Sequence, residues 1–222
     1  MNMQVKNSKI KGCSWVITRT LQEDKYWFRQ TYSWPDWSRA GIRTPFLYDG
    51  EIKGLFKNTW RGLYKQEYPY EYAMLAHCSY GKALIVAVDM REHSKTFLKH
   101  IIIECSAYNN LQIYLEKGFA FGVLMLEDNT LIHIKTDAPF NKSYQKIYRW
   151  DDPAFGIVWP EKYAIDTNKF IISTVDQYAP LTNLQLVEKV KQAYEKEKDE
   201  LLKQIGQLSY EVNWLKKKSG RL

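Results

Sequence analysis

The chain has 222 residues, of which 45% are hydrophobic and 26% charged, and its formal net charge is +7. This composition excludes a disordered or fibrous protein and suits one sizeable globular domain with an appendage. The positive charge is spread along the chain, +4 before residue 181 and +3 from there on, so no nucleic-acid partner is expected.

The number and spacing of the cysteines and histidines indicate whether the chain binds a metal ion or forms disulfides. Cys13, Cys78 and Cys105 are odd in number and form no C-x-x-C pair, so neither a disulfide framework nor a zinc site is predicted. The four histidines lack a ligand spacing such as H-x-H, and we expect no metal. The first residues contain no apolar signal-peptide core and no run reaches membrane-spanning length, which predicts a cytoplasmic protein without membrane association.

Short apolar or alternating runs follow one another through the first 135 residues and are rich in Val, Ile, Phe and Tyr. This pattern is typical of an antiparallel β-sandwich or barrel, and no βαβ alternation or glycine-rich phosphate loop interrupts it. The predicted strands include residues 13–18, 26–32, 83–88, 99–105, 111–115, 121–126 and 130–135. The predicted turns are Asp49-Gly50, Tyr80-Gly81, Asn109-Asn110 and Asp128-Asn129.

The sequence changes character after Pro180, where Glu, Lys, Gln and Leu predominate and proline is absent. Its regularly spaced apolar residues are Leu201, Ile205, Leu208, Val212 and Leu215. This heptad spacing, with β-branched residues at a and leucine at d, favours a parallel two-stranded coiled coil. We therefore predict a domain over residues 1–181 and a C-terminal coiled-coil helix over residues 182–222.

Five segments resemble, in order and spacing, motifs of the dTDP-4-dehydrorhamnose 3,5-epimerases. They are WRGL at 60–63, AVDMR at 87–91 with SKTF at 94–97, GFAFG at 118–122, WDDPAFGIVWP at 150–160 and ISTVD through APL at 172–181. Each motif alone is weak, but five in order over the first 181 residues specify a fold. The resemblance implies a mainly β, cupin or jelly-roll antiparallel barrel.

The resemblance also implies a reaction and a partner. Members of this family are dimers that epimerise a dTDP-4-keto-6-deoxy sugar at C3 and C5, without metal or redox cofactor. The ketone acidifies the neighbouring C–H bonds, so a base removes a proton from one face and an acid returns one from the other. We therefore expect a homodimer that binds this sugar or a related nucleotide sugar, in deoxysugar-nucleotide synthesis for surface polysaccharide.

At most of the positions that carry out this proton chemistry in the family, this sequence has a different residue type. The family's catalytic histidine corresponds to Tyr64, while the aspartate that orients it is kept as Asp176. The catalytic tyrosine corresponds to Ile134, a lysine that stabilises the enolate to Met74, and a further histidine to Phe121. Tyr64 would need a pKa about 3 units below its usual value near 10 to act as a base at neutral pH, a cost of roughly 4 kcal/mol. Tyr64 and Asp176 are the candidate catalytic residues, and a structural hydroxyl–carboxylate pair is the alternative.

Substrate-binding residues are also implied by the resemblance. Arg61 is the retained arginine of the first motif, and guanidinium groups suit diphosphate or keto oxygens, although a structural ion pair is an equal alternative. Lys25 occupies the place of an early arginine, and Glu51 lies where the family has a Gln-Asp-Asn stretch. Gln66 and Lys135 complete the predicted set.

The tail carries a second resemblance. Residues 204–218 are similar to the leucine zipper of an orphan-frame protein of some insertion-sequence transposases. Because the DNA-binding part of that family has no counterpart here, the resemblance implies self-association only. A generic coiled coil with the same heptads, or a gene fusion, would produce the same pattern.

Three hypotheses follow. The first is an epimerase-family protein with weak, altered or lost C3/C5 epimerase activity. The second is a non-catalytic sugar-nucleotide-binding or scaffolding barrel that self-associates through its coiled coil. The third, a transposition-related protein, depends on the tail alone.

Overall fold

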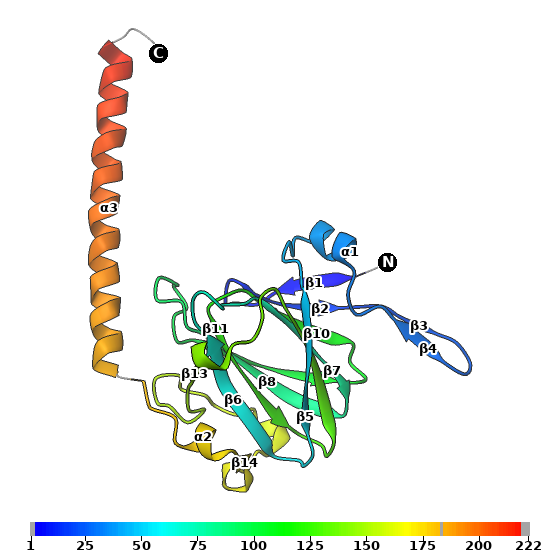
Figure 1. Ribbon diagram of the computed structural model, residues 1–222. Coiled ribbons are helices and arrows are strands. Elements are labelled where there is room, and N and C mark those ends of the chain that lie inside the picture. The colour runs from blue at the N-terminus through cyan, green and yellow to red at the C-terminus, as the bar shows by residue number, and fades with distance from the viewer. Residues whose placement is uncertain (1–2, 183, 219–222) are drawn as a thin grey trace. The chain divides into compact units, whose positions relative to one another are not determined.

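A computed structural model describes residues 3–182 and 184–218. The chain divides into two compact units, Met1–Leu181 and Thr182–Leu222 (Figure 1). The first unit is mainly β, and the second contains one helix, α3 (Leu184–Lys218). No helix in these two ranges is both long and apolar enough to cross a membrane.

Two sheets make up most of the first unit, and their strands pair antiparallel with one exception. The first sheet has the order β1 (Gln4–Asn7), β2 (Cys13–Ile17), β10 (Leu111–Leu115), β7 (Met74–Tyr80), β12 (Thr130–Thr136) and β5 (Tyr48–Gly54). The second has the order β13 (Gln145–Ile147), β6 (Thr59–Gln66), β11 (Phe119–Met125), β8 (Lys82–Asp89) and β9 (His100–Ser106), with β14 (Ile171–Ile172) parallel to β6. The prediction of a mainly β, antiparallel fold is confirmed.

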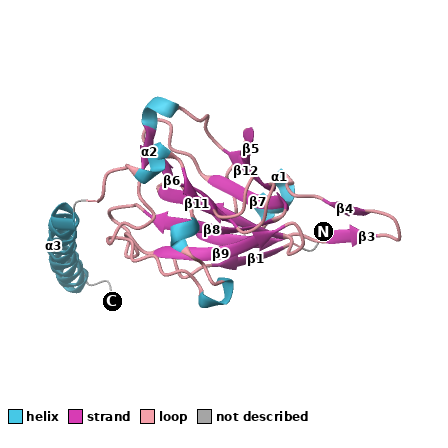
Figure 2. Ribbon diagram, turned by 90° about the horizontal axis from the view of Figure 1, so that it is seen from below, coloured by secondary structure: helices cyan, strands magenta, loops and turns pink. Residues whose placement is uncertain are grey.

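Smaller elements surround the sheets. A two-stranded hairpin, β3 (Thr20–Gln22) and β4 (Trp27–Arg29), extends away from both sheets (Figure 1 and Figure 2). The helical elements of the first unit are α1 (Trp34–Arg39), α2 (Thr174–Gln177) and three 3₁₀ turns, η1 (Lys142–Tyr144), η2 (Glu161–Tyr163) and η3 (Thr167–Lys169). Trp37 of α1 packs with Val16 and Leu75, so this segment covers the outer face of the first sheet.

The core lies between the sheets because alternate side chains of each strand point to the same face. Ala76, Cys78 and Ile132 of the first sheet pack in one cluster with Ile85 and Val123 of the second. Fully burying a side chain such as Ile or Val stabilises the fold by about 1.5–3 kcal/mol. All three cysteines are buried and free, and burial raises the pKa of the Cys78 thiol to about 11.

Two local predictions are wrong. Residues 26–32 form a strand only at Trp27–Arg29, where the short partner β3 lies opposite. Asp49-Gly50 is not a turn but part of β5, with Gly50 opposite Ile134 of β12. A Cβ on Gly50 would lie 3.3 Å from Ile134 Cγ1, so the glycine makes room for that side chain. The other three predicted turns do connect strands.

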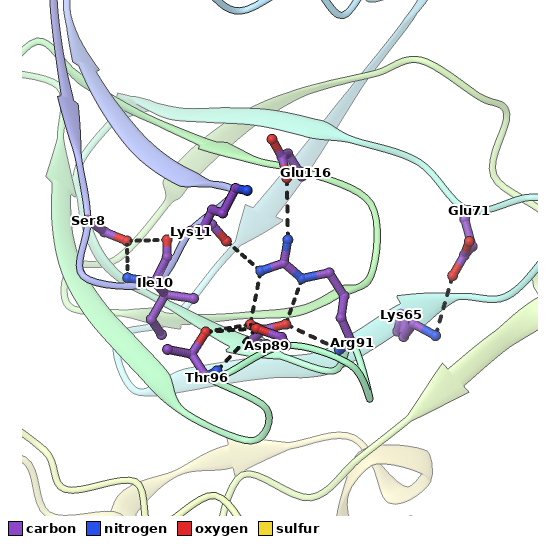
Figure 3. Close-up of polar contacts among 10 residues, drawn as sticks. Ser8, Ile10, Lys11, Lys65, Glu71, Asp89, Arg91, Thr96 and Glu116 are labelled. Carbon is purple, nitrogen blue, oxygen red and sulfur yellow. Dashed lines mark hydrogen bonds and ion pairs between the residues drawn. The ribbon is translucent and has the colours of Figure 1, made fainter. Parts of the chain in front are cut away.

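The second motif of the sequence forms an ionic network around the buried carboxylate of Asp89 at the end of β8 (Figure 3). Asp89 is fully buried and accepts hydrogen bonds from Arg91 at 2.8 and 2.9 Å and from Ser94 and Thr96. Arg91 also donates to the Lys11 carbonyl and pairs with Glu116. Burial alone would raise the pKa of Asp89, but the donors from Arg91, Ser94 and Thr96 outweigh it and hold that pKa below its usual value.

Asp89→Asn should therefore destabilise the fold by about 3 kcal/mol, because it leaves Arg91 without its buried partner. Urea unfolding monitored by circular dichroism measures the loss. Because the folded-state pKa of Asp89 is depressed, its contribution is present above the ordinary aspartate pKa and is lost as the pH falls through the folded value. The control is Asp36→Asn, which breaks the exposed pair with Arg39 and should cost at most about 1 kcal/mol. Equal losses in the two variants would contradict the prediction.

Candidate functional site

A pocket of about 520 Å³ is lined by residues from both sheets and from α2. Its polar lining consists of Glu51, Arg61, Tyr64, Tyr72, Lys142, Gln145, Ser173 and Asp176. Its apolar lining consists of Ile52, Met74, Phe121, Ile134, Phe140, Ile147 and Val175. The volume lies within the usual range for small-molecule sites.

An irregularity in β6 brings Arg61 and Tyr64 to the same pocket. Phe121 of β11 pairs with Tyr64 but Val123 pairs with Arg61, so three residue steps on β6 match two on β11. Such a bulge re-aims side chains that regular alternation would send to opposite faces. At its centre Gly62 has φ of +119°, and a Cβ there would lie 2.6 Å from Gly122 Cα. The glycine of the first motif is therefore required by the close approach of two strands.

Tyr64 and Asp176 are in contact, as predicted. The Tyr64 hydroxyl donates to Asp176 Oδ2 at 2.8 Å, although 112 positions separate the two residues. Asp176 is 3% exposed and lies in α2, whose N-cap Ser173 accepts from the Asp176 backbone N–H. Burial, followed by the hydrogen bond and the charge of Asp176, raises the pKa of Tyr64 to about 12, and Arg61 only partly opposes this.

The wall formed by the neighbouring strands is apolar. Met74, Phe121 and Ile134 point inward from β7, β11 and β12. These are the positions to which the family resemblance assigns a lysine, a histidine and a tyrosine. His133 of β12 faces the other side of its sheet, where its ring lies 5.3 Å from that of His77, so it does not replace the missing groups.

Two of the predicted substrate-binding residues line the pocket. Arg61 is exposed, and its guanidinium carbon lies 6.0 Å from the centre of the Tyr64 ring. It has no ion pair with a carboxylate among the described residues, so its charge is available to a ligand. Glu51 lies at the pocket as well, on the edge strand β5.

The structure places the other three predicted residues outside the pocket. Lys25 is exposed at the turn of the β3–β4 hairpin. Gln66 is buried and its Oε1 accepts from the Asn141 backbone N–H at 2.9 Å, which is a structural role. Lys135 follows Ile134 and therefore points to the opposite face of β12, where it pairs with Asp49 at 2.5 Å. Neighbouring residues of a strand point to opposite sides of its sheet, so Ile134 and Lys135 cannot both face the pocket.

Sequence reasoning missed Lys142 and Gln145, which line the pocket from the segment between β12 and the end of β13. The Gln66 side chain accepts a hydrogen bond from the Asn141 backbone N–H, just before Lys142. No motif marks Lys142 and Gln145, because their position depends on contacts with residues that are distant in the sequence. Within the described ranges, no group of three or more His, Cys, Asp or Glu side chains is arranged to hold a metal ion.

Comparison with known proteins identifies relatives of this chain. The family model for dTDP-4-dehydrorhamnose 3,5-epimerase matches residues 7–184. The dTDP-4-dehydrorhamnose 3,5-epimerase of Sinorhizobium fredii is 32% identical over 176 residues, which cover 79% of this chain and 82% of that protein. The Escherichia coli enzyme of the same name is 28% identical over 79% of this chain and 92% of that protein.

Solved structures of proteins with the same name are similar to this chain in fold. The dTDP-4-dehydrorhamnose 3,5-epimerase of Elizabethkingia anophelis matches with a TM-score of 0.73 and 29% identity, over 81% of this chain and 96% of that one. The Bacillus anthracis enzyme, solved with TDP and PPi bound, matches with a TM-score of 0.76 and 26% identity, over 82% of this chain and 100% of that one.

The Tyr64 hydroxyl should stay protonated well beyond the usual tyrosine pKa near 10. With a pKa of about 12, its phenolate does not form at neutral pH, and the difference in ultraviolet titration between wild type and Tyr64→Phe should show a transition near pH 12. Asp176→Asn should lower that pKa, since it removes a neighbouring negative charge. Because the folded-state pKa is raised, the stability from this group is present below pH 10 and is lost as the pH rises toward 12. A transition below pH 9 would contradict the prediction.

Proposed function

The chain belongs to the dTDP-4-dehydrorhamnose 3,5-epimerase family, and we propose that it is a nucleotide-sugar-binding member whose C3/C5 epimerase activity is weak, altered or lost. The observation that carries this proposal is the pairing of Tyr64 with Asp176 beside Ile134, Met74 and Phe121. No histidine or lysine stands at the positions from which the family moves protons.

The pKa of Tyr64 and the lack of an acid at Ile134 explain why proton transfer should be slow. A neutral imidazole is a competent base because its pKa lies near the operating pH. With a pKa of about 12, Tyr64 is a phenolate in only about one molecule in 10⁵ at pH 7. Ile134 has no proton to return on the other face. Losing both groups should cost more than the roughly hundredfold that one general base contributes.

Ligand binding is supported by what the pocket retains. Arg61 and Lys142 supply positive charge to the pocket, and cationic side chains suit the oxygens of a diphosphate. The relative from Bacillus anthracis was solved with TDP and PPi. The inferred partner of this chain is a dTDP-4-keto-6-deoxy sugar or a related nucleotide sugar, and its role lies in deoxysugar-nucleotide metabolism.

A separate observation supports self-association through α3. Leu201, Ile205 and Leu208 are 51–59% exposed, and Val212 and Leu215 continue the same heptad stripe. In a parallel pair, Glu211 at a g position would face Lys216 at the following e position of the second copy, an attractive contact. We therefore propose that α3 forms a parallel two-stranded coiled coil, which would make the protein a homodimer or a larger assembly of barrels.

Exchange of the C3 and C5 protons of dTDP-4-keto-6-deoxyglucose in D₂O, followed by NMR, tests the catalytic part. The unmodified chain should exchange both protons at least about a hundredfold more slowly than the Escherichia coli relative. Tyr64→His combined with Ile134→Tyr should raise the rate, and Met74→Lys should raise it further by stabilising the enolate. Fast exchange in the unmodified chain that Tyr64→Phe abolishes would make Tyr64 a working base and the proposal wrong.

Leu208→Lys in the full chain should lower the oligomeric state measured by light scattering during size-exclusion chromatography, because it places charge in the apolar stripe. Tyr210→Lys is the matched control, since this exposed residue lies at an f position away from the stripe. The same drop in both variants, or in neither, would contradict a coiled coil along the predicted seam.

A further inference from the structure

Lys142 lines the pocket from a short turn whose backbone is fixed on both sides of it. Before Lys142, the buried Gln66 side chain accepts from the Asn141 backbone N–H at 2.9 Å. After it, the Glu67 backbone N–H donates to the Tyr144 carbonyl at 2.8 Å. These bonds tie η1 and its flanks to the end of β6, so the place of Lys142 is determined by residues that are distant in the sequence.

The cations around this turn differ in whether a carboxylate pairs with them. Lys65 and Lys146 both pair with Glu67, at 2.9 and 3.3 Å. Lys142 and Arg61 have no ion pair with a carboxylate among the described residues, and both line the pocket. The two cations at the pocket are thus the ones whose charge is not already balanced by a neighbouring side chain.

The carboxylates of the pocket leave this positive charge in place. Asp176 is buried and accepts from the Tyr64 hydroxyl. Glu51 is exposed, but it belongs to β5 of the first sheet. Arg61 lies on β6 and Lys142 directly before β13, the strand paired with β6, and both are exposed. The second-sheet side of the pocket therefore presents two exposed cations, which favours an anionic group there.

We propose that Lys142 binds the phosphate groups of the ligand and determines the preference of the pocket for a phosphate-bearing molecule, and that Gln66 is the positioning residue for Lys142. The inference rests on the proposed function, which supplies a nucleoside diphosphate as part of the ligand. The Gln66 Nε2 is buried without a hydrogen-bond partner among the described residues, so its amide acts through the bond that Oε1 accepts from Asn141. Lysine carries its charge on a flexible stem, and it therefore depends on its backbone position to reach phosphate oxygens.

Isothermal titration calorimetry of dTDP with the full chain, repeated over a series of NaCl concentrations, tests the contact. Lys142→Met should weaken binding at least about tenfold, since it removes a hydrogen bond between charged groups, and should make the affinity less dependent on salt. Lys146→Met is the matched control, because it removes the same charge from an exposed lysine that pairs with Glu67, and it should change the affinity by less than about twofold. Equal affinities of the two variants, whether reduced or unchanged, would overturn the role of Lys142.

Gln66→Met tests the positioning role in the same titration, since methionine has a similar length but offers no comparable acceptor to the Asn141 N–H. This variant should weaken dTDP binding by about threefold or more and reduce its salt dependence. It should cause no further loss in Lys142→Met, because the two residues act through one contact. No loss in the single variant, a loss that adds fully to that of Lys142→Met, or an unchanged salt dependence would overturn the positioning role.

The outcomes separate this inference from the proposed function. If the unmodified chain binds dTDP and Lys142→Met binds it equally well, nucleotide-sugar binding stands and the role of Lys142 is wrong. If the unmodified chain does not bind dTDP, the proposed function is wrong and this inference with it. Lys142 and Lys146 are both exposed, so the comparison of their variants does not depend on the packing of the core.

Discussion

The alternation of side chains along paired β-strands is the constraint on which the pocket depends. Met74, Phe121 and Ile134 belong to three strands of two sheets. Successive side chains of a strand alternate between its two faces, and these three point to the face that lies between the sheets. Register between strands is fixed by the buried apolar face, since a shift of one residue would expose it. The exception is the bulge in β6, which adds Arg61 to the side that Tyr64 already occupies.

The contact between Tyr64 and Asp176 satisfies one oxygen of a buried carboxylate. The resemblance to the family implies an aspartate at this position that orients a histidine. That role requires the neighbouring side chain to donate a hydrogen bond to the carboxylate. Tyrosine also donates one hydrogen bond, so the Tyr64 hydroxyl satisfies Asp176 Oδ2 without supplying a base. Because the same carboxylate raises the pKa of the phenol, the interaction that stabilises the pair also opposes proton removal. The raised pKa therefore disfavours Tyr64 as a general base near neutral pH.

The helix α3 uses a different principle from the β unit. The β unit buries its apolar residues within its own two sheets, whereas the apolar residues of α3 between Leu201 and Leu215 are about half exposed or more. A single helix cannot bury a stripe on itself, so most of its stability must come from packing against another surface. The two units thus differ in where their apolar residues lie: those of the β unit are buried in its own core, and those of α3 are exposed in the single chain.

Local patterns in the sequence determined the β class, most strand positions, three of four turns and the position of α3, because alternation, turn residues and heptads are properties of neighbouring residues. The motif resemblance also predicted the contact of Tyr64 with Asp176. Asp49-Gly50 looks like a turn in isolation, but pairing with β12 makes it strand, and Gly50 is needed there to accommodate Ile134. Likewise, Lys135 faces away from the pocket and Gln66 anchors the segment after β12, whereas Lys142 and Gln145 of that segment line the pocket. Only tertiary structure decided these roles, because inter-strand register, one bulge and one buried loop anchor join residues that no local pattern connects.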